Sequence, residues 1–435
     1  MPHERLLEPA VEAISRDELR ARQEELLRRQ VARCAAASSL YGAKLASVGA
    51  EASDVRTLDD LSRLPVVTKE ELREDQRRQP PFGTFAVAPA SAFRELHPST
   101  GTTGAPVNTI WSARDVETIT RLTMRTLWQF GVRAGDVIQN AFAYGLWVAG
   151  LSCHYAGGRL GCLVVPTGTS TPTERQIEYL RTLGSTVRLS TPSYALHIAE
   201  TARERGVDPS TLPLRLGCFG GEAGAGNPST RRKLEDGLGI DAFDYYGLAE
   251  VGPTFASECE AKAGIHLAED YVVVECVDPD TRAPVSEGAL GVLVFTHLTR
   301  EATPMIRYWS NDYARLSTER CECGRTHVRA VGGVVGRHDD LVVFRGAKFY
   351  PSQVERIVRS FSELGDEFRI ELELPDGVLV ERCTVVCELR EEVPGVEPRL
   401  AGALRAELGV TPAVRLEPFG HLERSAFKAQ RLVRL

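Results

Sequence analysis

The sequence lacks an apolar run long enough to cross a membrane. A membrane-spanning helix needs about 18 or more consecutive residues that are almost all apolar, and no such run occurs among the 435 residues. The first residues, MPHERLLEPAVEAISRDELRARQ, are also too charged to form the apolar core of a signal peptide. We therefore expect no membrane partner and a cytoplasmic location.

An excess of positive charge is missing as well. The net charge is -7 and the pI is about 5.8, so the chain as a whole does not attract nucleic acid or an anionic membrane. Basic residues interleaved with aromatic residues, as in a nucleic-acid-binding surface, do not occur either. We expect small-molecule ligands and no nucleic acid partner.

Internal repeats and low-complexity linkers are absent, and 43% hydrophobic and 26% charged residues are typical of a globular protein. The length suits roughly two or three domains. Without a secretion signal, the ten cysteines indicate reduced thiols or metal ligands rather than a disulfide framework. Most have apolar neighbours, which predicts core packing: Cys34, Cys153, Cys162, Cys218, Cys276, Cys383 and Cys387.

Hydrophobic periodicity predicts an α/β fold. An amphipathic helix is expected from Arg16 to about Lys44, and Thr68 with Glu71 forms a capping-box pattern that begins another. From about 136 to 250, short apolar runs alternate with helical segments, which predicts a layered domain with a substantial parallel sheet. YVVVECVDPDT and GALGVLVFT, between 271 and 296, indicate strands of a smaller β-rich subdomain.

The last hundred or so residues predict a compact α+β domain. Val354, Ile357, Val358 and Phe361 form an apolar helical stripe, and FRIELEL and ERCTVVCEL are strand patterns on either side of a Pro-Asp-Gly turn. The polar segment 336–340 is the expected boundary. We therefore predict a large N-terminal domain over 1–336 and a small mobile C-terminal domain over 337–435.

One hydroxyl-rich loop favours phosphate binding. Ser99-Thr100-Gly101-Thr102-Thr103-Gly104-Ala105-Pro106 offers backbone N–H groups and side-chain hydroxyls together, which suits phosphate oxygens. It is not a Walker loop, because the lysine that such a loop requires is absent. Taken alone, the segment is equally typical of a surface turn.

The order of several motifs resembles the adenylate-forming superfamily, and within it the phenylacetate-coenzyme A ligase family. The matching segments span nearly the whole chain: LPVVTKEELRED, STGTTGAPV, AYGLWVAGLSCHYAGGRLGCLVVP, YYGLAEVGPTFASEC, GRHDDLVVFRGAKFYPSQVE and ERSAFKAQRLV. The resemblance implies ATP-dependent activation of an aromatic carboxylic acid as acyl-AMP, followed by transfer to coenzyme A.

The resemblance also implies roles for individual residues in ATP binding. Thr102 and Thr103 would supply hydroxyls to the β- and γ-phosphates within the loop Ser99 to Gly104. Gly220, Gly221, Glu222 and Ala223 would lie along the adenine, with Tyr245, Tyr246 and Gly247 nearby and Tyr246 near the ring. Glu250 would hold Mg²⁺ against the phosphates, as a hard cation prefers, and Asp312 and Arg337 would hold the ribose.

Two further residues receive roles in the reaction cycle. Lys428 resembles the lysine that reaches the site during adenylation, and Asp339 resembles the hinge about which the C-terminal domain turns. The chain departs from the family pattern at Phe427, where a glycine is usual. It also has Ala105 where a phosphate-binding lysine is common, so that ATP binding is weaker or another cation compensates.

A segment rich in aromatic residues resembles one wall of the family's acid pocket. Tyr144-Gly145-Leu146-Trp147 places two aromatic rings beside a glycine, which suits a flat aryl acid. Gly220 and Tyr245 are expected at the same pocket. The alternative is that these residues are ordinary core.

A separate group of residues suits structural zinc. Cys259, His266, Cys321 and Cys323 supply three thiolates and an imidazole, a tetrahedral set with no open position. The spacing is not that of a standard zinc finger, although some members of the resembled family carry the same positions. His327 is a competing ligand.

Two other functions compete with an aryl-CoA ligase. The acyl group could pass to an acyl carrier protein or an amine instead, and Arg345 and Lys348 could face either acceptor. A non-catalytic zinc-containing binding protein is the remote alternative. The residues leave open which acid is used and whether the protein is a homodimer.

Overall fold

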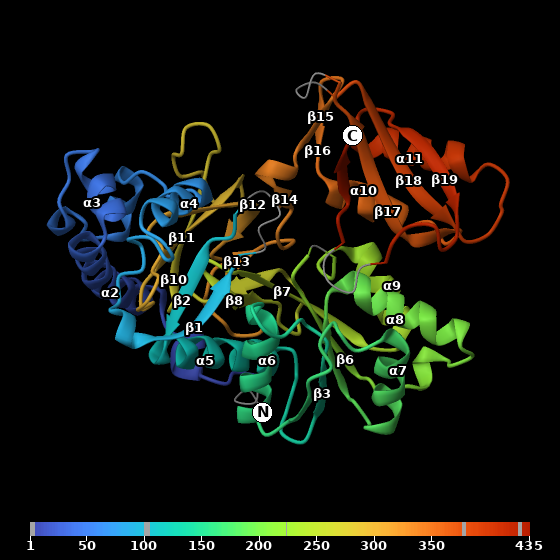
Figure 1. Cartoon of the computed structure of the whole chain (residues 1–435), viewed down its shortest axis with the longest axis horizontal. Coiled ribbons are helices and arrows are strands. Elements are labelled where there is room, and N and C mark those ends of the chain that lie inside the picture. Colours follow the sequence, from blue (N-terminus) through green and yellow to red (C-terminus); the bar gives the residue numbers. More distant parts are fainter. Residues whose placement is uncertain (1–4, 100–104, 223, 376–379, 425–428) are drawn as a thin grey trace. The chain divides into compact units, whose positions relative to one another are not determined.

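The computed structural model describes residues 5–99, 105–222, 224–375, 380–424 and 429–435. The chain forms two compact units, of which the first comprises Met1–Gly168 and Tyr245–Gly333 and the second comprises Thr169–Asp244 and Val334–Leu435 (Figure 1). Each unit is described by itself.

Helices open the first unit. α1 is Pro9–Glu12, α2 is Arg16–Ala37, α3 is Ser39–Ala46 and α4 is Lys69–Arg78. The expected single helix from Arg16 to Lys44 was wrong, because Ser38 is extended and its side chain accepts a hydrogen bond from the Tyr41 N–H to begin α3. The capping box that begins α4 was confirmed, since the Thr68 hydroxyl accepts from the Glu71 N–H and the Glu71 carboxylate accepts from the Thr68 N–H.

A hairpin and a small α/β layer follow in the first unit. The strands are β1 (Phe93–Pro98), β2 (Asn108–Ser112), β3 (Val137–Asn140) and β4 (Leu163–Val165), and the helices are α5 (Ala113–Gln129) and α6 (Val148–Arg159). β1 and β2 are antiparallel, whereas β3 and β4, connected by α6, are parallel. β3 and β4 confirm that short apolar runs after about residue 136 form strands, as the sequence predicts.

The rest of the first unit is an antiparallel sheet. β7 spans Asp241–Leu248 and enters this unit at Tyr245, and the other strands are β8 (Gly252–Ser257), β9 (Ile265–Leu267), β10 (Val272–Val277), β11 (Leu290–His297), β12 (Tyr308–Ser317) and β13 (Arg329–Ala330). They lie in the order β10-β11-β12-β13-β9-β8-β7. β10 and β11 are the expected strand-turn-strand segment, and β7 and β12 carry the predicted nucleotide residues.

Parallel strands and helices begin the second unit. β5 (Val187–Ser190), β6 (Leu216–Phe219) and residues 241–244 of β7 are parallel neighbours, accompanied by α7 (Thr173–Thr182), α8 (Pro192–Glu204) and α9 (Pro228–Leu238). All four residues of β5 and of β6 are buried, as expected for strands that are covered on both faces. The predicted alternation of strands and helices was confirmed.

The C-terminal part of the second unit is α+β, as predicted. Its elements are β14 (Gly336–Arg337), β15 (Val342–Phe344), β16 (Ala347–Phe349), α10 (Pro351–Val358), β17 (Leu364–Glu373), β18 (Arg382–Leu389), α11 (Val396–Leu408), β19 (Ala413–Pro418) and β20 (Leu432–Arg434). The four-stranded sheet has the order β19-β18-β17-β20. Its core includes Val354, Phe368, Ile370 and Leu400.

Within this unit, polar contacts join the C-terminal part to α9. Lys233 forms an ion pair of 2.6 Å with Asp366, and the Arg359 guanidinium donates to the Thr230 hydroxyl at 2.9 Å. Residues 334–435 therefore belong to one compact unit with 169–244. The division into domains at 336/337, with a mobile C-terminal domain, stays a prediction.

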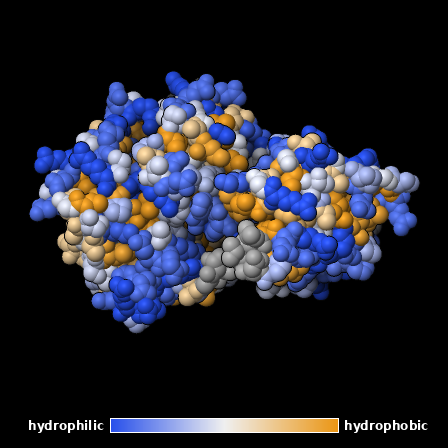
Figure 2. Space-filling view, turned by 90° about the horizontal axis from the view of Figure 1, so that it is seen from above, coloured by the Kyte–Doolittle hydropathy of each residue, from blue (hydrophilic) through white to orange (hydrophobic). Residues whose placement is uncertain are grey.

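No helix in the described ranges combines the length and the apolar character that crossing a bilayer requires. Figure 2 shows apolar and hydrophilic residues interspersed over the face that it presents. Leu146, next to the predicted acid pocket, is 57% exposed. Several 3₁₀ turns complete the connections: Ala52–Asp54, Leu58–Arg63, Ala90–Ala92, Pro209–Thr211 and His338–Asp340.

Candidate active site

Two of the predicted nucleotide residues are in direct contact in the first unit. The Tyr246 hydroxyl on β7 donates a hydrogen bond of 2.6 Å to Oδ2 of Asp312 on β12. Asp312 is 3% exposed. It lies 66 residues from Tyr246 in the sequence, so the folded sheet is what brings the two side chains together. The Tyr246 ring lies 5.4 Å from the ring of Phe255. The sheet therefore holds the expected adenine and ribose residues side by side.

Gly247 allows β7 to approach β8 closely just after Tyr246. A Cβ atom at this position would lie 1.9 Å from the carbonyl oxygen of Pro253 on β8, so only glycine fits. β7 and β8 can thus approach closely just before and after the turn that carries Glu250. This is a structural role, and contact of Gly247 with nucleotide stays a prediction.

Glu250 presents a buried carboxylate that is not saturated by hydrogen bonds. The residue is 3% exposed, and its Oε1 atom has no hydrogen-bond partner among the residues that the structure describes. The Lys69 Nζ atom lies 3.0 Å from Oε1 as an ion pair, so charge rather than hydrogen-bond geometry balances the acid. A buried carboxylate oxygen with free accepting capacity fits a hard divalent ion such as Mg²⁺.

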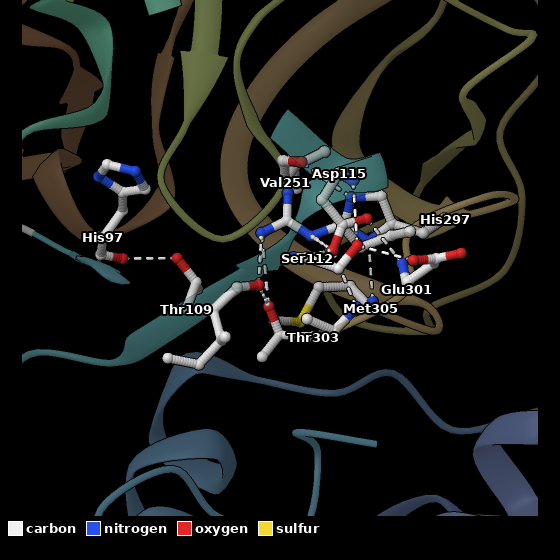
Figure 3. A network of polar contacts seen from close by, with 12 residues as sticks. His97, Thr109, Ser112, Asp115, Val251, His297, Glu301, Thr303 and Met305 are labelled. Carbon is white, nitrogen blue, oxygen red and sulfur yellow. Dashed lines mark hydrogen bonds and ion pairs between the residues drawn. The ribbon is translucent and has the colours of Figure 1, made fainter. Parts of the chain in front are cut away.

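Buried polar groups contact the backbone on both sides of Glu250, and Figure 3 includes Val251, the residue that follows it. The Thr109 hydroxyl, which donates to the His97 carbonyl at 2.5 Å, also lies 3.3 Å from the Ala249 carbonyl oxygen, and the His297 Nε2–H donates to the Val251 carbonyl at 2.8 Å. The Tyr271 hydroxyl donates to the same Val251 oxygen at 2.7 Å. Glu250 therefore lies between two carbonyl groups that are held in place.

His297 is neutral in this network. Its Nδ1 accepts from the Met305 N–H at 2.8 Å, which leaves the proton on Nε2 for Val251. Burial lowers the pKa of His297 to about 3, with a smaller contribution from the charge of Arg300. Figure 3 shows that the network continues through Asp115 and Glu301, where Asp115 accepts from the Glu301 N–H at 2.7 Å.

The ends of the predicted phosphate loop are tied together. Ser99 N–H donates to the Val107 carbonyl at 2.9 Å, and Val107 N–H donates to the Ser99 hydroxyl at 3.0 Å. Ser99 is buried, so it closes the loop from within. The remaining loop residues proposed for phosphate lie outside the described residues: Thr100, Gly101, Thr102, Thr103 and Gly104.

The aromatic segment from Tyr144 to Trp147, which is predicted to line the acid pocket, contacts polar side chains on one side. The Tyr144 hydroxyl accepts from the Asn140 amide at 2.9 Å and lies 3.3 Å from His154 Nδ1. Gly145 has a φ of 88°, which favours glycine, and Trp147 is the N-cap of α6. Tyr245, on β7, is buried with its ring 5.9 Å from that of Phe142. An acid pocket at these residues stays a prediction.

In the second unit, Glu222 joins two segments. One carboxylate oxygen accepts from the Ser193 N–H in the first turn of α8, and the other accepts from the Ala429 N–H, each at 2.9 Å. Gly220 is buried, Gly221 is exposed with a φ of 88°, and Ala223 lies outside the described residues. Glu222 therefore holds the backbone next to Lys428, a contact that the sequence did not predict.

Arg337 and Asp339 pair with each other. The Arg337 guanidinium donates through Nε and Nη2 to the two oxygens of Asp339, each at 2.9 Å. This bidentate pair restrains the backbone at the expected hinge. The ribose role of Arg337 and the hinge role of Asp339 stay predictions, and Lys428 lies outside the described residues.

The four predicted zinc ligands form one buried cluster in the first unit. The ligand atoms of Cys259, His266, Cys321 and Cys323 all lie within 4.8 Å of one another. The sulfur atoms of Cys259 and Cys321 are 3.7 Å apart, and the Cys323 sulfur is 3.5 Å from His266 Nε2. Tetrahedral zinc would place such pairs about 3.8 Å and about 3.6 Å apart, respectively.

The surroundings prepare these side chains for a cation. His266 Nδ1 contacts the carbonyl oxygen of His327 at 3.3 Å, which leaves Nε2 for a metal. Thus His327 contributes its backbone, and its ring is not part of the cluster. Hydrogen bonds from Cys259 and His266 lower the pKa of the Cys323 thiol although burial opposes this. None of the ten cysteines, all within the described ranges, forms a disulfide.

Comparisons with known proteins agree with this geometry. Residues 346–434 match the family model described as the AMP-binding enzyme C-terminal domain. The phenylacetate-coenzyme A ligase of Thermus thermophilus is 36% identical, over 97% of this chain and 97% of its own length. That of Pseudomonas putida is also 36% identical, over 98% and 95%. The chain belongs to the phenylacetate-coenzyme A ligase family.

A solved structure extends the likeness to the arrangement of elements. The crystal structure of 2-hydroxyisobutyryl-CoA ligase, in the postadenylation state with R3-HIB-AMP, matches with a TM-score of 0.92. It is 28% identical, and the match covers 98% of this chain and 91% of that one. The α/β fold with a C-terminal domain, predicted from the sequence, is thereby confirmed.

Sequence reasoning missed the residues that support Glu250 in this member of the phenylacetate-coenzyme A ligase family. His297 and Thr109 lie in strand-like segments that look like ordinary core, and only the tertiary structure brings them to Ala249 and Val251. Lys69 was detectable in part, because it directly follows the predicted cap Thr68 in one of the family's motifs.

Proposed function

We propose that this acid–CoA ligase converts an aromatic carboxylic acid and ATP into acyl-AMP and pyrophosphate, and then transfers the acyl group to coenzyme A. The observation that carries the proposal is that β7 and β12 bring Tyr246 and Asp312 into contact, while the turn after β7 carries the buried Glu250 carboxylate. The Tyr246–Asp312 hydrogen bond and the unsaturated Oε1 of Glu250 provide adjacent positions for ribose hydroxyls and for a phosphate-bound cation.

The nucleotide is held by groups of opposite character. Asp312 accepts hydrogen bonds from the ribose hydroxyls, with its carboxylate held by Tyr246. The loop from Ser99 to Gly104 donates N–H and O–H groups to the phosphates. Glu250 would hold Mg²⁺, which neutralises charge on the phosphate oxygens when it is bound. The supported backbone at Ala249 and Val251 keeps the Glu250 carboxylate in place for this task.

The chemistry needs positioning and charge rather than a general base. The substrate carboxylate oxygen attacks the α-phosphorus, and the bond from that phosphorus to the bridging oxygen of the β-phosphate breaks. Lys428 stabilises the negative charge that develops between these groups. After the C-terminal domain turns about Asp339, coenzyme A, as a thiolate that has lost its proton to solvent, attacks the acyl carbon, and the bond from that carbon to the AMP oxygen breaks to release AMP.

The substrate class follows from the aromatic segment after β3. Tyr144 and Trp147 supply apolar faces for an aryl ring, and Gly145 leaves room beside them. The Asn140 and His154 contacts fix the Tyr144 hydroxyl and so hold the ring in one orientation.

A structural zinc ion in the first unit completes the proposal. The two inter-ligand distances of 3.7 Å and 3.5 Å fit tetrahedral zinc, and the carbonyl oxygen of His327 contacts the second ring nitrogen of His266, which keeps the first nitrogen turned to the site. With three thiolates and one imidazole, the site has no open position, so zinc would stabilise the fold between β8 and β13 and take no part in the reaction.

Acid-dependent ATP–pyrophosphate exchange tests the first step. A panel of benzoates, phenylacetates and heteroaryl acids is compared with aliphatic acids of similar size, and we expect exchange only with aryl acids. Thioester formation is then measured with coenzyme A, acyl carrier proteins and amines as acceptors. Exchange with aliphatic acids alone would contradict the substrate class, and thioester or amide formation only with the other acceptors would contradict the second step.

A further inference from the structure

One face of α4 follows the exit of the predicted phosphate loop. Lys69, Arg73 and Gln76 are spaced by four and three residues, which places them on the same side of the helix. The Arg73 Nε donates to the Ala105 carbonyl at 2.8 Å, and the Gln76 amide donates to the Pro106 carbonyl at 3.1 Å. Lys69 extends this face to Glu250.

The loop itself contains no cation. Residues 99–106 read STGTTGAP, so hydroxyls and N–H groups would have to balance the charge of a triphosphate without a basic side chain. Ala105 is exposed, whereas the Arg73 side chain that contacts it is 12% exposed. The cations nearest to this loop in the described contacts therefore come from α4.

Lys69 differs from Lys44, which lies close to the same helix. The Lys44 ammonium donates to the Val66 carbonyl at 2.7 Å and pairs with Glu71, so it fastens the segment before α4. The Lys69 ammonium contacts Oε1 of Glu250, an oxygen that receives no hydrogen bond, and its side chain is 26% exposed. Lys69 therefore balances the charge of the proposed magnesium ligand from a partly open position.

We propose that Lys69 is a further catalytic residue, whose ammonium group binds the β- and γ-phosphates of ATP and then the departing pyrophosphate. The inference rests on the proposed function. Lys69 lies beside the Glu250 carboxylate that would hold a divalent cation, and its long side chain can direct the ammonium charge toward the nearest phosphate oxygens. Lys69 thus replaces the cation that the loop lacks at Ala105, while Arg73 positions the loop through its carbonyl.

The charges of the step balance with this assignment. The acid carboxylate forms a bond to the α-phosphorus while the α-to-β bridging bond breaks, and the electron pair of that bond leaves on pyrophosphate. No proton is transferred at Lys69. The ammonium group is needed where negative charge accumulates, on the leaving group, and is not needed when coenzyme A attacks acyl-AMP.

The experiment compares the two half-reactions in the full chain. Lys69→Met should lower ATP–pyrophosphate exchange about 10²-fold, the scale for removing one preorganised charge, whereas thioester formation from supplied acyl-AMP should change by less than about twofold. The double variant Lys69→Met/Ala105→Lys should show exchange at least about tenfold faster than Lys69→Met alone. Lys44→Met, matched in size and charge, should leave exchange within about twofold of the parent.

Nucleotide binding supplies a readout that needs no acid. By calorimetry, Lys69→Met should weaken ATP binding at least about tenfold and leave AMP binding unchanged, because AMP lacks the two phosphates. Equal affinities of variant and parent for ATP, equal loss of both half-reactions, or no rescue by Ala105→Lys would overturn the assignment. An unaltered chain that binds ATP but shows no exchange with any acid would contradict the proposed function instead.

Discussion

Two buried polar clusters of the first unit show how differently a sheet can present charged groups. At Cys259, His266, Cys321 and Cys323 the ligand atoms face one another within 4.8 Å. At Glu250 the carboxylate faces a lysine, and one buried oxygen keeps free accepting capacity. The first cluster can be completed by one ion and then has nothing left to bind. The second can still accept a cation because, apart from the ion pair with Lys69, its partners support the backbone rather than the carboxylate.

The largest effect should come from removing ligands of the Cys259, His266, Cys321 and Cys323 cluster, which one ion would close. We expect about one equivalent of zinc in the untagged protein, and its loss in Cys321→Ser/Cys323→Ser, because thiolates hold structural zinc and its binding energy contributes to folding. The free energy of unfolding should fall by about 3 kcal/mol or more. Elemental analysis and urea unfolding measure the two quantities.

Cys276→Ser is the matched control for the cysteine variant, since Cys276 lies on β10 outside the cluster and is only half-buried. It should keep its zinc. Zinc that persists undiminished in the double variant, or that is absent from the parent protein, would contradict the zinc prediction.

The cluster around Glu250 is called the open cluster, because its carboxylate can still accept a cation. Changing Glu250 should affect activity and not folding. Glu250→Gln replaces a carboxylate by an amide, a much poorer ligand for Mg²⁺, so ATP–pyrophosphate exchange should fall about 10²-fold or more with little change in melting temperature. Glu301→Gln, at the far end of the same network, is the control. Near-normal exchange of Glu250→Gln at saturating ATP and Mg²⁺ would mean that Glu250 does not hold the cation.

The two clusters were not equally predictable from the sequence. Cysteine and histidine are informative wherever they gather, so the four ligands could be named without knowing that β9 and the segment before β13 are adjacent. Glu250 and Asp312 were named because the order of motifs matched a family. Lys69, the partner of Glu250, was not named, because a lysine in a charged helix usually lies in solvent.

Failures of sequence reasoning had local and long-range causes. The break at Ser38 was missed because the helical pattern continues through it, and only the capping hydrogen bond from Tyr41 marks the start of α3. Glu222 was assigned to adenine, but the structure also engages both carboxylate oxygens with backbone N–H groups. Such contacts join segments far apart in the chain, and periodicity says nothing about them.

The support beneath the open cluster should depend on pH. Burial lowers the pKa of His297 to about 3, whereas an imidazole in the unfolded chain has a pKa of about 6.5. Between these values the unfolded state binds the additional proton. The free energy of unfolding therefore has its full His297 contribution above about pH 6.5 and falls as the pH decreases toward 3, by up to about 1.4 kcal/mol per pH unit.

His297→Gln isolates this contribution. Glutamine keeps a donor and an acceptor but does not titrate, so the free energy of unfolding of the variant should change less between pH 7.5 and about 5 than that of the parent. Urea unfolding at several pH values provides the comparison. Arg300 and Asp115, the charged groups that face His297, are unchanged in both proteins. Parallel pH profiles would show that His297 does not couple protonation to folding.

The smallest effect should come from removing the Tyr246 hydroxyl, which contacts Asp312 in the predicted nucleotide site. The Tyr246 hydroxyl donates to Oδ2 of Asp312 at 2.6 Å, so Tyr246→Phe removes one hydrogen bond from the carboxylate while keeping the ring that is predicted to face the adenine. One hydrogen bond to a charged group contributes about 1.5–3 kcal/mol, of which solvent or neighbouring groups recover a part. We therefore expect the KM for ATP to rise about five- to tenfold with kcat nearly unchanged.

The preference for ATP over 2′,3′-dideoxy-ATP should narrow by a similar factor, because only the nucleotide with both hydroxyls gains from an oriented Asp312. Asp312→Asn should narrow that preference further. If Tyr246→Phe lowers kcat and leaves the ribose preference intact, the hydroxyl acts on the reacting groups and not on the ribose, and the assignment of Asp312 to the sugar would be wrong.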